Sequence, residues 1–369
     1  MRAPLWAAVS VLPQGQVRGL AAVACVEQRN KVEVVRRMKR PQWLPDNFVL
    51  TLLALLVLAS VLPVRGEAAV WAGHVTNAAI ALLFFLHGAK LSTQAVIQGL
   101  SHWRLHGVVL SVTFILFPLL AWVLGPVLRP LLGEELYRGM VYLSVLPSTV
   151  QSAIALTAMA RGNVAAAVCG AATSSLLGIF ITPLLVLVFM GSALGGLHFG
   201  DAVIKVMVQL LLPFVLGQIA RRWIGQWVDK NKAMLKHVDQ SSVYLVIYTA
   251  FSKAVVDGLW SQMALSQVLT LIACCFVLLV VVLSVCYWVT RSLGLNMADR
   301  ITALFGGAQK SLATGVPMAQ VLFAGTPMGA LLLPLMLYHQ VQLMTCAILA
   351  RRFGQRPEEA VETGAVPAK

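Results

Sequence analysis

The feature that most constrains the fold of this chain is a series of ten apolar segments, which starts at Phe48 and ends near Ala350. Most have the roughly 17–25 residues that a helix needs to cross a bilayer, and the first and seventh are shorter. Only 11% of the residues are charged, against about a quarter in soluble domains. Because hydrocarbon offers no partner for backbone groups, such segments must be helical, and we expect an all-α integral membrane protein with ten transmembrane helices. The expected segments are approximately Phe48–Pro63, Val70–Gly88, Leu105–Leu128, Met140–Met159, Val164–Met190, Ile204–Ala220, Val243–Val256, Leu265–Val289, Ile301–Phe323 and Met328–Ala350.

The basic residues between these segments predict the topology. With the N-terminus inside, seventeen Lys and Arg residues fall on the cytoplasmic side and four on the other, namely Arg65, Arg129, Arg138 and Lys205. Positive residues favour the cytoplasmic side of membrane proteins. We therefore expect a multi-pass protein of the inner or plasma membrane with both termini in the cytoplasm, and the net charge of +14 indicates topology rather than nucleic-acid binding.

Two of the apolar segments are interrupted by polar residues. The fourth contains residues 146–153 (LPSTVQSA), and the ninth contains residues 305–317 (FGGAQKSLATGVP), which include Lys310. Unwound backbone at membrane depth requires protein or a watery cavity to satisfy it. Broken helices at corresponding positions of two halves are typical of a transporter's binding site. We expect the two breaks to face each other near the midplane.

The same two breaks indicate an inverted repeat, because they occupy the fourth and ninth of ten segments. Residues 38–198 would form the first five-helix repeat, residues 199–350 the second, and residues 351–369 a cytoplasmic tail. Residues 1–37 fit neither a span nor a signal peptide. They are expected to be a disordered leader or an over-extended gene start before Met38, with an interfacial amphipathic helix as the alternative.

The polar residues of the breaks, with two from the second segment, are the candidate binding residues for a solute or ion. Lys310 is the strongest of these candidates, because placing a charge at mid-membrane depth costs a free energy of about 2.5–3.5 kcal/mol on insertion scales and therefore requires a partner. The alternative for each is structural: Lys310 as a strut on helix carbonyls, and the others as partners of unwound backbone or of neighbouring helices. The candidates are Thr76, Asn77, Ser148, Thr149, Gln151, Ser152, Gln309, Lys310, Ser311 and Thr314.

Six stretches, in order, together resemble the bile acid:sodium symporter superfamily. They are residues 78–91 (AAIALLFFLHGAKL), 147–154 (PSTVQSAI), 162–163 (GN), 178–185 (GIFITPLL), 309–313 (QKSLA) and 333–339 (LPLMLYH). The nearer match is the SBF-like branch, which includes bacterial proteins and the seventh member of solute carrier family 10. The resemblance covers about residues 40–353. It implies ten helices, a core domain of helices 3–5 and 8–10, a panel domain of helices 1, 2, 6 and 7, and two discontinuous helices that cross in the core.

The resemblance also implies a changed sodium site. Sodium-coupled relatives carry a glutamate where this chain has Phe305, and an asparagine where it has Lys310. Their Ser-Asn pair in the fourth helix corresponds here to Gln151-Ser152 or to Ser152-Ala153. Lys310 would then take the electrostatic place of a bound cation. Coupling could be to sodium, to protonation of Lys310, or absent, and no other cofactor or confident metal site is expected.

The sequence therefore predicts a secondary transporter of a small organic solute by alternating access, with membrane lipid as its surroundings, and Lys310 together with the helix N-termini at the breaks favours an anionic solute. No H-E-x-x-H, G-x-S-x-G or Walker sequence is present, so an enzyme is not expected. Nothing in the chain indicates an oligomeric state. The alternative is a membrane regulator or scaffold that keeps the transporter fold without transport.

Overall fold

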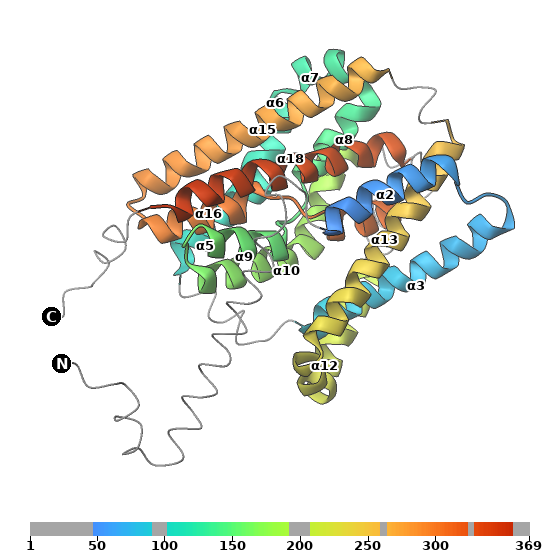
Figure 1. The fold of residues 1–369 in the computed structure, drawn as a ribbon, viewed down its shortest axis with the longest axis horizontal. Helices are drawn as coiled ribbons and strands as arrows, with labels where there is room; N and C mark the ends of the chain where they lie inside the picture. The colour runs from blue at the N-terminus through green and yellow to red at the C-terminus, as the bar shows by residue number, and fades with distance from the viewer. Residues whose placement is uncertain (1–46, 91–101, 192–206, 259–263, 324–327, 357–369) are drawn as a thin grey trace, which may run out of the picture. The chain divides into compact units, whose positions relative to one another are not determined.

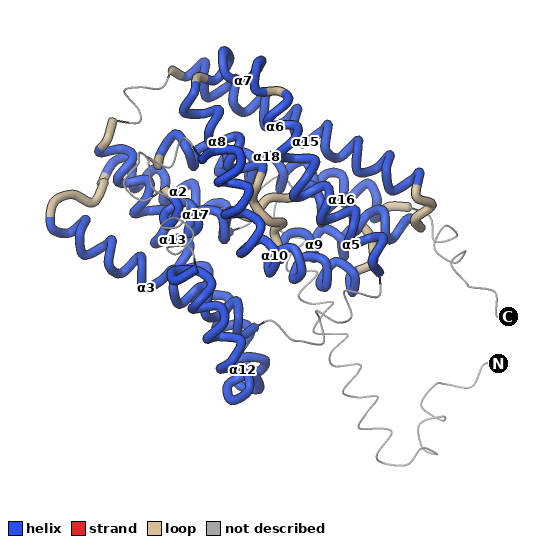
Figure 2. Tube along the Cα trace, turned by 180° about the vertical axis from the view of Figure 1, so that it is seen from behind, coloured by secondary structure: helices blue, strands red, loops and turns tan. Residues whose placement is uncertain are grey.

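The computed structural model describes residues 47–90, 102–191, 207–258, 264–323 and 328–356, which form helices joined by short turns and loops (Figures 1 and 2). The chain divides into two units, Met1–Leu50 and Thr51–Lys369, and only the start of α2 is described in the first. The expected leader (residues 1–37), the boundary between the expected repeats and most of the expected tail lie outside the described residues.

Each expected apolar segment coincides with one helix or with a run of helical pieces. In chain order the elements are α2 (Asn47–Val61), α3 (Glu67–Lys90), α5 (Trp103–Ser111), the π-helical turn η3 (Val112–Leu116), α6 (Phe117–Val123), α7 (Gly125–Leu132), α8 (Glu134–Ser144), α9 (Val150–Met159), α10 (Val164–Met190), the π-helical turn η5 (Met207–Leu211), α12 (Leu212–Lys230), α13 (Lys232–Val256), α15 (Leu265–Ser292), α16 (Met297–Ala308), α17 (Leu312–Leu322) and α18 (Gly329–Gly354).

Five stretches of the described residues are both long and apolar enough to cross a membrane, which makes this a multi-pass membrane protein by length and composition. They are Glu67–Lys90, Trp103–Val123, Val164–Met190, Leu265–Ser292 and Gly329–Gly354. The remaining expected segments are shorter, interrupted or more polar. The count of ten crossings and the inverted repeat stay predictions.

The helices of the larger unit pack in two sets. In the first, α3 packs along α12 and against α13. In the second, α8 packs against α18, α15 against α16 and α18, and α16 against α5, α9 and α10. Both α17 and α18 also contact α13, so these helices join the two sets.

The first set is held together by an unusually close approach of α3 and α12. A Cβ atom added at Gly88 would overlap the carbonyl oxygen of Phe214, and one added at Gly217 would overlap the carbonyl oxygen of Phe85. Glycine is the residue that allows helix backbones to come this close in membrane proteins. The reciprocal Phe-x-x-Gly spacing therefore fixes where the two helices cross.

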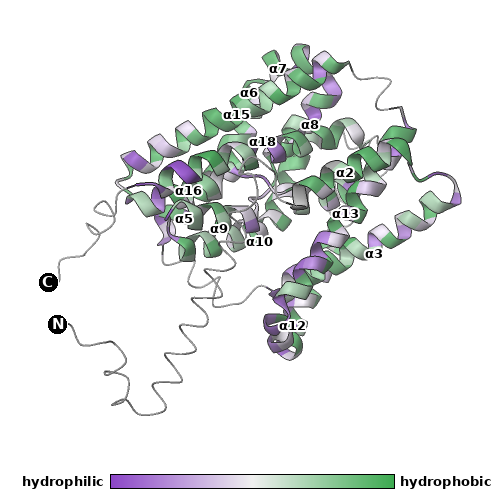
Figure 3. Ribbon diagram, viewed as in Figure 1, coloured by the Kyte–Doolittle hydropathy of each residue, from purple (hydrophilic) through white to green (hydrophobic). Residues whose placement is uncertain are grey.

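Beyond this crossing, α12 and α13 become hydrophilic. Figure 3 shows polar residues gathered where these two helices meet. Arg221 bonds the carbonyl of Ala89 and lies 3.2 Å from Asp229, and Lys90 forms an ion pair with Asp239. These contacts tie the end of α3 to the α12–α13 hairpin.

Candidate functional site

Both predicted breaks are present as gaps between helices. Helix α8 ends at Ser144 and α9 begins at Val150, while α16 ends at Ala308 and α17 begins at Leu312. Pro147 disfavours the helical conformation of the residue before it, which explains the first gap. Gly178 on α10 faces Pro147 so closely that a Cβ atom would lie 2.6 Å from the proline ring. The first break is therefore packed tightly against α10.

The two breaks lie directly against each other. The Ser311 amide donates to the Pro147 carbonyl at 2.9 Å, and the Thr149 hydroxyl donates to the Lys310 carbonyl at 2.8 Å. The hydroxyl of Ser152 donates to Oε1 of Gln309 at 2.5 Å. The expectation that the breaks face each other is confirmed by these three bonds, and their depth in a membrane stays a prediction.

Lys310 is the centre of the crossing. Its side chain is fully buried, and Nζ donates to the carbonyl oxygens of Thr113, Ser144 and Leu146 at 2.8, 2.7 and 2.8 Å. Nζ also lies 4.1 Å from the centroid of the Phe117 ring. Three carbonyls accept three N–H bonds, the number that an ammonium provides, and an aromatic face adds a cation–π contact.

Two of the three carbonyls that accept from Lys310, those of Thr113 and Ser144, lack a donor within their own helix, each for a local reason. In the π-helical turn η3 the Phe117 amide donates to the carbonyl of Val112. In this register the carbonyl of Thr113 would pair with residue 118, and Pro118 has no N–H. Ser144 ends α8, where helix carbonyls lack an intrahelical donor and carry the negative end of the helix dipole. Lys310 thus caps the C-terminus of α8, and it donates to the carbonyl in η3 that Pro118 leaves without a backbone donor.

The backbone of Lys310 is clamped as well. Gln342 on α18 accepts from the Lys310 amide at 2.8 Å through Oε1 and donates to the Lys310 carbonyl at 3.0 Å through Nε2. Tyr338 donates to the carbonyl of Ala308 at 2.8 Å, and Tyr142 donates to that of Gly315 at 2.6 Å. Gln342 and Tyr338 thus satisfy backbone that the break leaves without intrahelical partners, and Tyr142 joins α8 to α17.

Polar atoms remain without partners beside this network. In the described part of the chain, Oγ of Ser148, Nε2 of Gln309 and Oγ1 of Thr314 are buried and form no hydrogen bond. Buried polar atoms without a partner are uncommon and expensive. They are available to a ligand or to water at the crossing.

No acidic side chain of the residues that the structure describes takes part in the contacts at the crossing. Among the described residues the one buried acid is Asp299, which accepts bonds from Asn163 and Asn296 at 2.9 Å each. Asp299 lies in the first turn of α16, at the opposite end of that helix from Lys310. Phe305 on α16 is fully buried and apolar. Nζ of Lys310 therefore lies among carbonyl oxygens and against the Phe117 ring, and not beside an acid.

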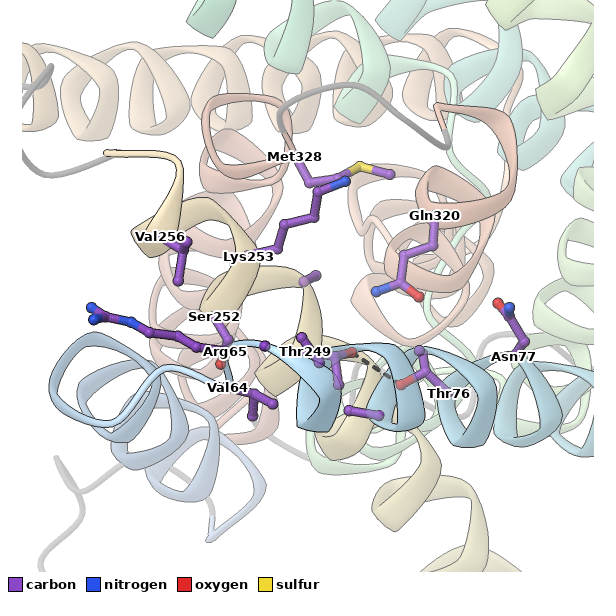
Figure 4. A pocket seen from close by; sticks show the side chains of 15 residues that line it. Val64, Arg65, Thr76, Asn77, Thr249, Ser252, Lys253, Val256, Gln320 and Met328 are labelled. Atoms are coloured by element: carbon purple, nitrogen blue, oxygen red, sulfur yellow. Dashed lines mark hydrogen bonds between the residues drawn. The ribbon is translucent and has the colours of Figure 1, made fainter.

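A cavity of about 430 Å³ lies where α3 and α13 face α17 and the start of α18 (Figure 4). Thr76 and Asn77 line it from α3, and the hydroxyl of Thr76 lies 3.1 Å from that of Thr249 on α13. Gln320 lines it from α17 and donates to the carbonyl of Val246 at 3.1 Å. The cavity thus lies between the two helix sets.

The structure brings most of the candidate residues together, but in two places. Seven meet at the crossing: Ser148, Thr149, Ser152, Gln309, Lys310, Ser311 and Thr314. Thr76 and Asn77 belong instead to the cavity. Gln151 is exposed at the start of α9 and is not among the residues that join the two breaks.

The sequence reasoning missed several partners of Lys310. Thr113, Phe117 and Gln342 come from helices that carry no polar break, so their proximity to Lys310 has no signal in local pattern. Pro118 was the available clue, because a proline in a helix frees a carbonyl one turn earlier. The cationic lining of the cavity was also missed.

Comparison with known proteins places this architecture in a family. Residues 46–355 match the SBF-like CPA transporter family. The chain belongs to this family. It is 53% identical over 323 residues to an uncharacterised protein of Pseudomonas aeruginosa, covering 88% of this chain and 97% of that protein. It is 51% identical over 316 residues to YfeH of Escherichia coli, which is named as a symporter candidate, covering 85% and 94%.

A vertebrate relative is also similar along most of its length. The sodium/bile acid cotransporter 7-B of Xenopus laevis is 30% identical over 323 residues, covering 84% of this chain and 91% of that protein. The resemblance drawn from the six sequence stretches is confirmed. The chain is a membrane protein of a transporter family, and the relatives' names indicate transport rather than catalysis.

Proposed function

We propose that this protein is a secondary transporter of a small organic anion, in which Lys310 is a resident cation at the place where sodium-coupled relatives bind sodium. The solute would cross the inner or plasma membrane by alternating access. The membrane would hold ten helices in two inverted five-helix repeats, with both termini cytoplasmic. The first helix set would be the panel and the second the core.

The observation that carries this proposal is the cage around Nζ of Lys310. Three backbone carbonyls at 2.7–2.8 Å resemble the way that channels and transporters replace an ion's hydration shell with carbonyl oxygens. A sodium ion placed beside an ammonium in a buried site would be repelled. The cage therefore supports an ammonium group of the protein itself in the place of an exchangeable sodium ion.

The sequence departures agree with this assignment. Phe305 stands where the resemblance expects a sodium-binding glutamate, and its buried apolar ring offers no ligand. The relative from Xenopus laevis is named a sodium/bile acid cotransporter. For this chain we propose that Lys310 supplies the cation that a bound sodium ion supplies in those relatives, and that the loss of the carboxylate removes the anionic ligand that would hold sodium.

The solute would be held between the crossing and the cavity. Ser148, Gln309 and Thr314 offer buried polar atoms without partners at the crossing. Thr76 and Asn77 face the cavity between the proposed panel and core. The N-termini of α9 and α17, which start at the two breaks, would favour an anionic group.

The test compares thermal stability of the purified protein in sodium and choline buffers of equal ionic strength. We expect no sodium effect in the native protein, and stabilisation by sodium in Lys310→Asn, because a bound ion stabilises the state that binds it. Lys236→Asn, which removes an exposed lysine of α13, is the control and should not respond. Sodium stabilisation of the native protein would refute the resident-cation proposal.

Transport itself needs a separate measurement. The purified protein in vesicles should accumulate or exchange at least one organic anion from a metabolite panel. Absence of flux for every anion, with stabilisation only by a protein partner, would instead support the alternative of a non-transporting regulator or scaffold.

A further inference from the structure

We propose that the cavity between α3, α13 and α17 is an anion-binding vestibule in which Lys253 holds the carboxylate or sulfonate of a small organic monoanion. This deepens the proposed function, because it assigns the charge recognition of the solute to a lysine separate from Lys310. The vestibule is lined by Arg65, Thr76, Asn77, Ser252, Lys253 and Gln320, together with apolar residues.

The first observation is the charge of the lining. Lys253 and Arg65 line the cavity, and its lining residues include no acid. Figure 4 shows the Lys253 side chain extending toward Met328, across the space between α13 and α18. Neither cation forms an ion pair with another of the described residues. The acids nearest in sequence are Glu67 and Asp257, and neither lines the cavity.

The second observation is a buried hydroxyl in the same lining. Ser252 is 1% exposed, it lines the cavity, and its hydroxyl has no hydrogen-bond partner. Buried hydroxyls normally find a partner. Figure 4 shows this hydroxyl directed away from the end of the Lys253 side chain, so it is a separate donor for a polar group of the ligand. Nε2 of Gln320 donates to the carbonyl of Val246. Its Oε1 can therefore accept a hydrogen bond from a hydroxyl of the solute.

The remaining lining limits the class of ligand. Val64, Ala69, Ala72, Ala250, Val256 and Met328 make most of the wall apolar. Ligand pockets combine such walls with a few placed polar groups, and about 430 Å³ lies within the usual range of roughly 300–1,000 Å³. The ligand would therefore carry one anionic group at one end of a compact apolar body.

The position of the vestibule suits an approach from outside the cell. It is lined by residues 64–66 before α3, by the C-terminal turn of α13, by Gln320 near the end of α17 and by Met328 before α18. In the proposed topology all four lie toward the non-cytoplasmic side. Lys253 would concentrate anions at this mouth before they reach the crossing.

The test uses a reporter cysteine in the full-length protein. Gly73 lines the cavity, and a Cβ atom added there meets nothing within 4 Å. Gly73→Cys is labelled with two methanethiosulfonates of equal size, one anionic and one cationic, with the unsubstituted protein as background. The measured quantity is the ratio of the anionic to the cationic labelling rate, divided by the same ratio for a free small thiol.

We expect this ratio to exceed one and to fall about fivefold or more when Lys253→Gln is added, because one unit charge several ångströms away acts oppositely on the two reagents. Added salt should reduce the ratio, since it screens the charge. Lys236→Gln, at the other end of α13, is the matched control and should leave the ratio unchanged. An unchanged ratio in Lys253→Gln would overturn the proposal.

A ligand arm uses benzoate and its uncharged analogue benzamide as probes. Benzoate should slow labelling of Gly73→Cys in a Lys253-dependent manner, and benzamide should not. Equal protection by both probes, or none by benzoate, would overturn the assignment of a carboxylate to this vestibule. Lys253-dependent protection without anion flux in vesicles would keep the vestibule and refute transport, whereas flux that is indifferent to Lys253→Gln would keep transport and refute the vestibule.

Discussion

The strongest consequence of the structure concerns the removal of the Lys310 ammonium while its apolar stem is kept, as in Lys310→Met. Three buried carbonyls would lose their donors, and each unsatisfied group costs about 1–3 kcal/mol. The cation–π contact with Phe117, worth about 2 kcal/mol when desolvated, is lost as well. Against this, the variant no longer buries a charge, which recovers about 2.5–3.5 kcal/mol. The net expected loss is about 5 kcal/mol, taking the middle of each range.

The assay is thermal unfolding of the full-length protein in detergent, read from intrinsic fluorescence. For a chain of this size, a loss of about 5 kcal/mol corresponds to a fall of roughly 6 °C in Tm. Lys236→Met is the control, because it makes the same substitution at an exposed site, and it should shift Tm by less than about 2 °C. A Lys310→Met protein as stable as the native one would refute the reasoning that these carbonyls require a cation.

Three other substitutions test separate contacts. Gly88→Ala forces a Cβ atom onto a backbone carbonyl of α12, so the yield of folded protein should drop sharply. Gly73→Ala, which enters open space, should not change it. Gln342→Leu removes both side-chain bonds to the Lys310 backbone and should lower stability by about 2–4 kcal/mol in the same thermal assay. Tyr142→Phe removes one buried bond of 2.6 Å and should cost about 1 kcal/mol, and a larger loss would point to a wider role for this hydroxyl.

The helices and the two breaks were predictable from the sequence because their causes are local. A run of apolar residues, a proline such as Pro147, or a polar interruption acts on its own segment of chain. The same applies to Lys310, because the free-energy cost of a charged side chain at membrane depth follows from its position in an apolar segment and does not depend on which residues surround it. Lys310 does bond helix carbonyls, as the strut interpretation predicts, and a further role in binding a solute or coupling transport stays a prediction.

The sequence separated the candidates of the second segment from those of the breaks, but it could not say which break residues meet. Thr76 and Asn77, which come from the second segment and not from a break, line the cavity. Gln151 was included because Gln151-Ser152 is one of the two positions that the resemblance gives for the relatives' Ser-Asn pair, yet a helix turns neighbouring side chains about 100° apart. Ser152 therefore bonds Gln309 while Gln151 is exposed.

The sequence by itself thus determined a helical membrane protein with two unwound segments and a buried lysine that needed partners. Only the tertiary structure decided which partners these are. The carbonyl of Thr113 is 197 positions away from Lys310 in the chain, and no local propensity encodes such a pairing. It arises because the packing of η3, α8 and α18 brings unpaired carbonyls and the Gln342 amide to one buried point, where each polar group must be satisfied by another.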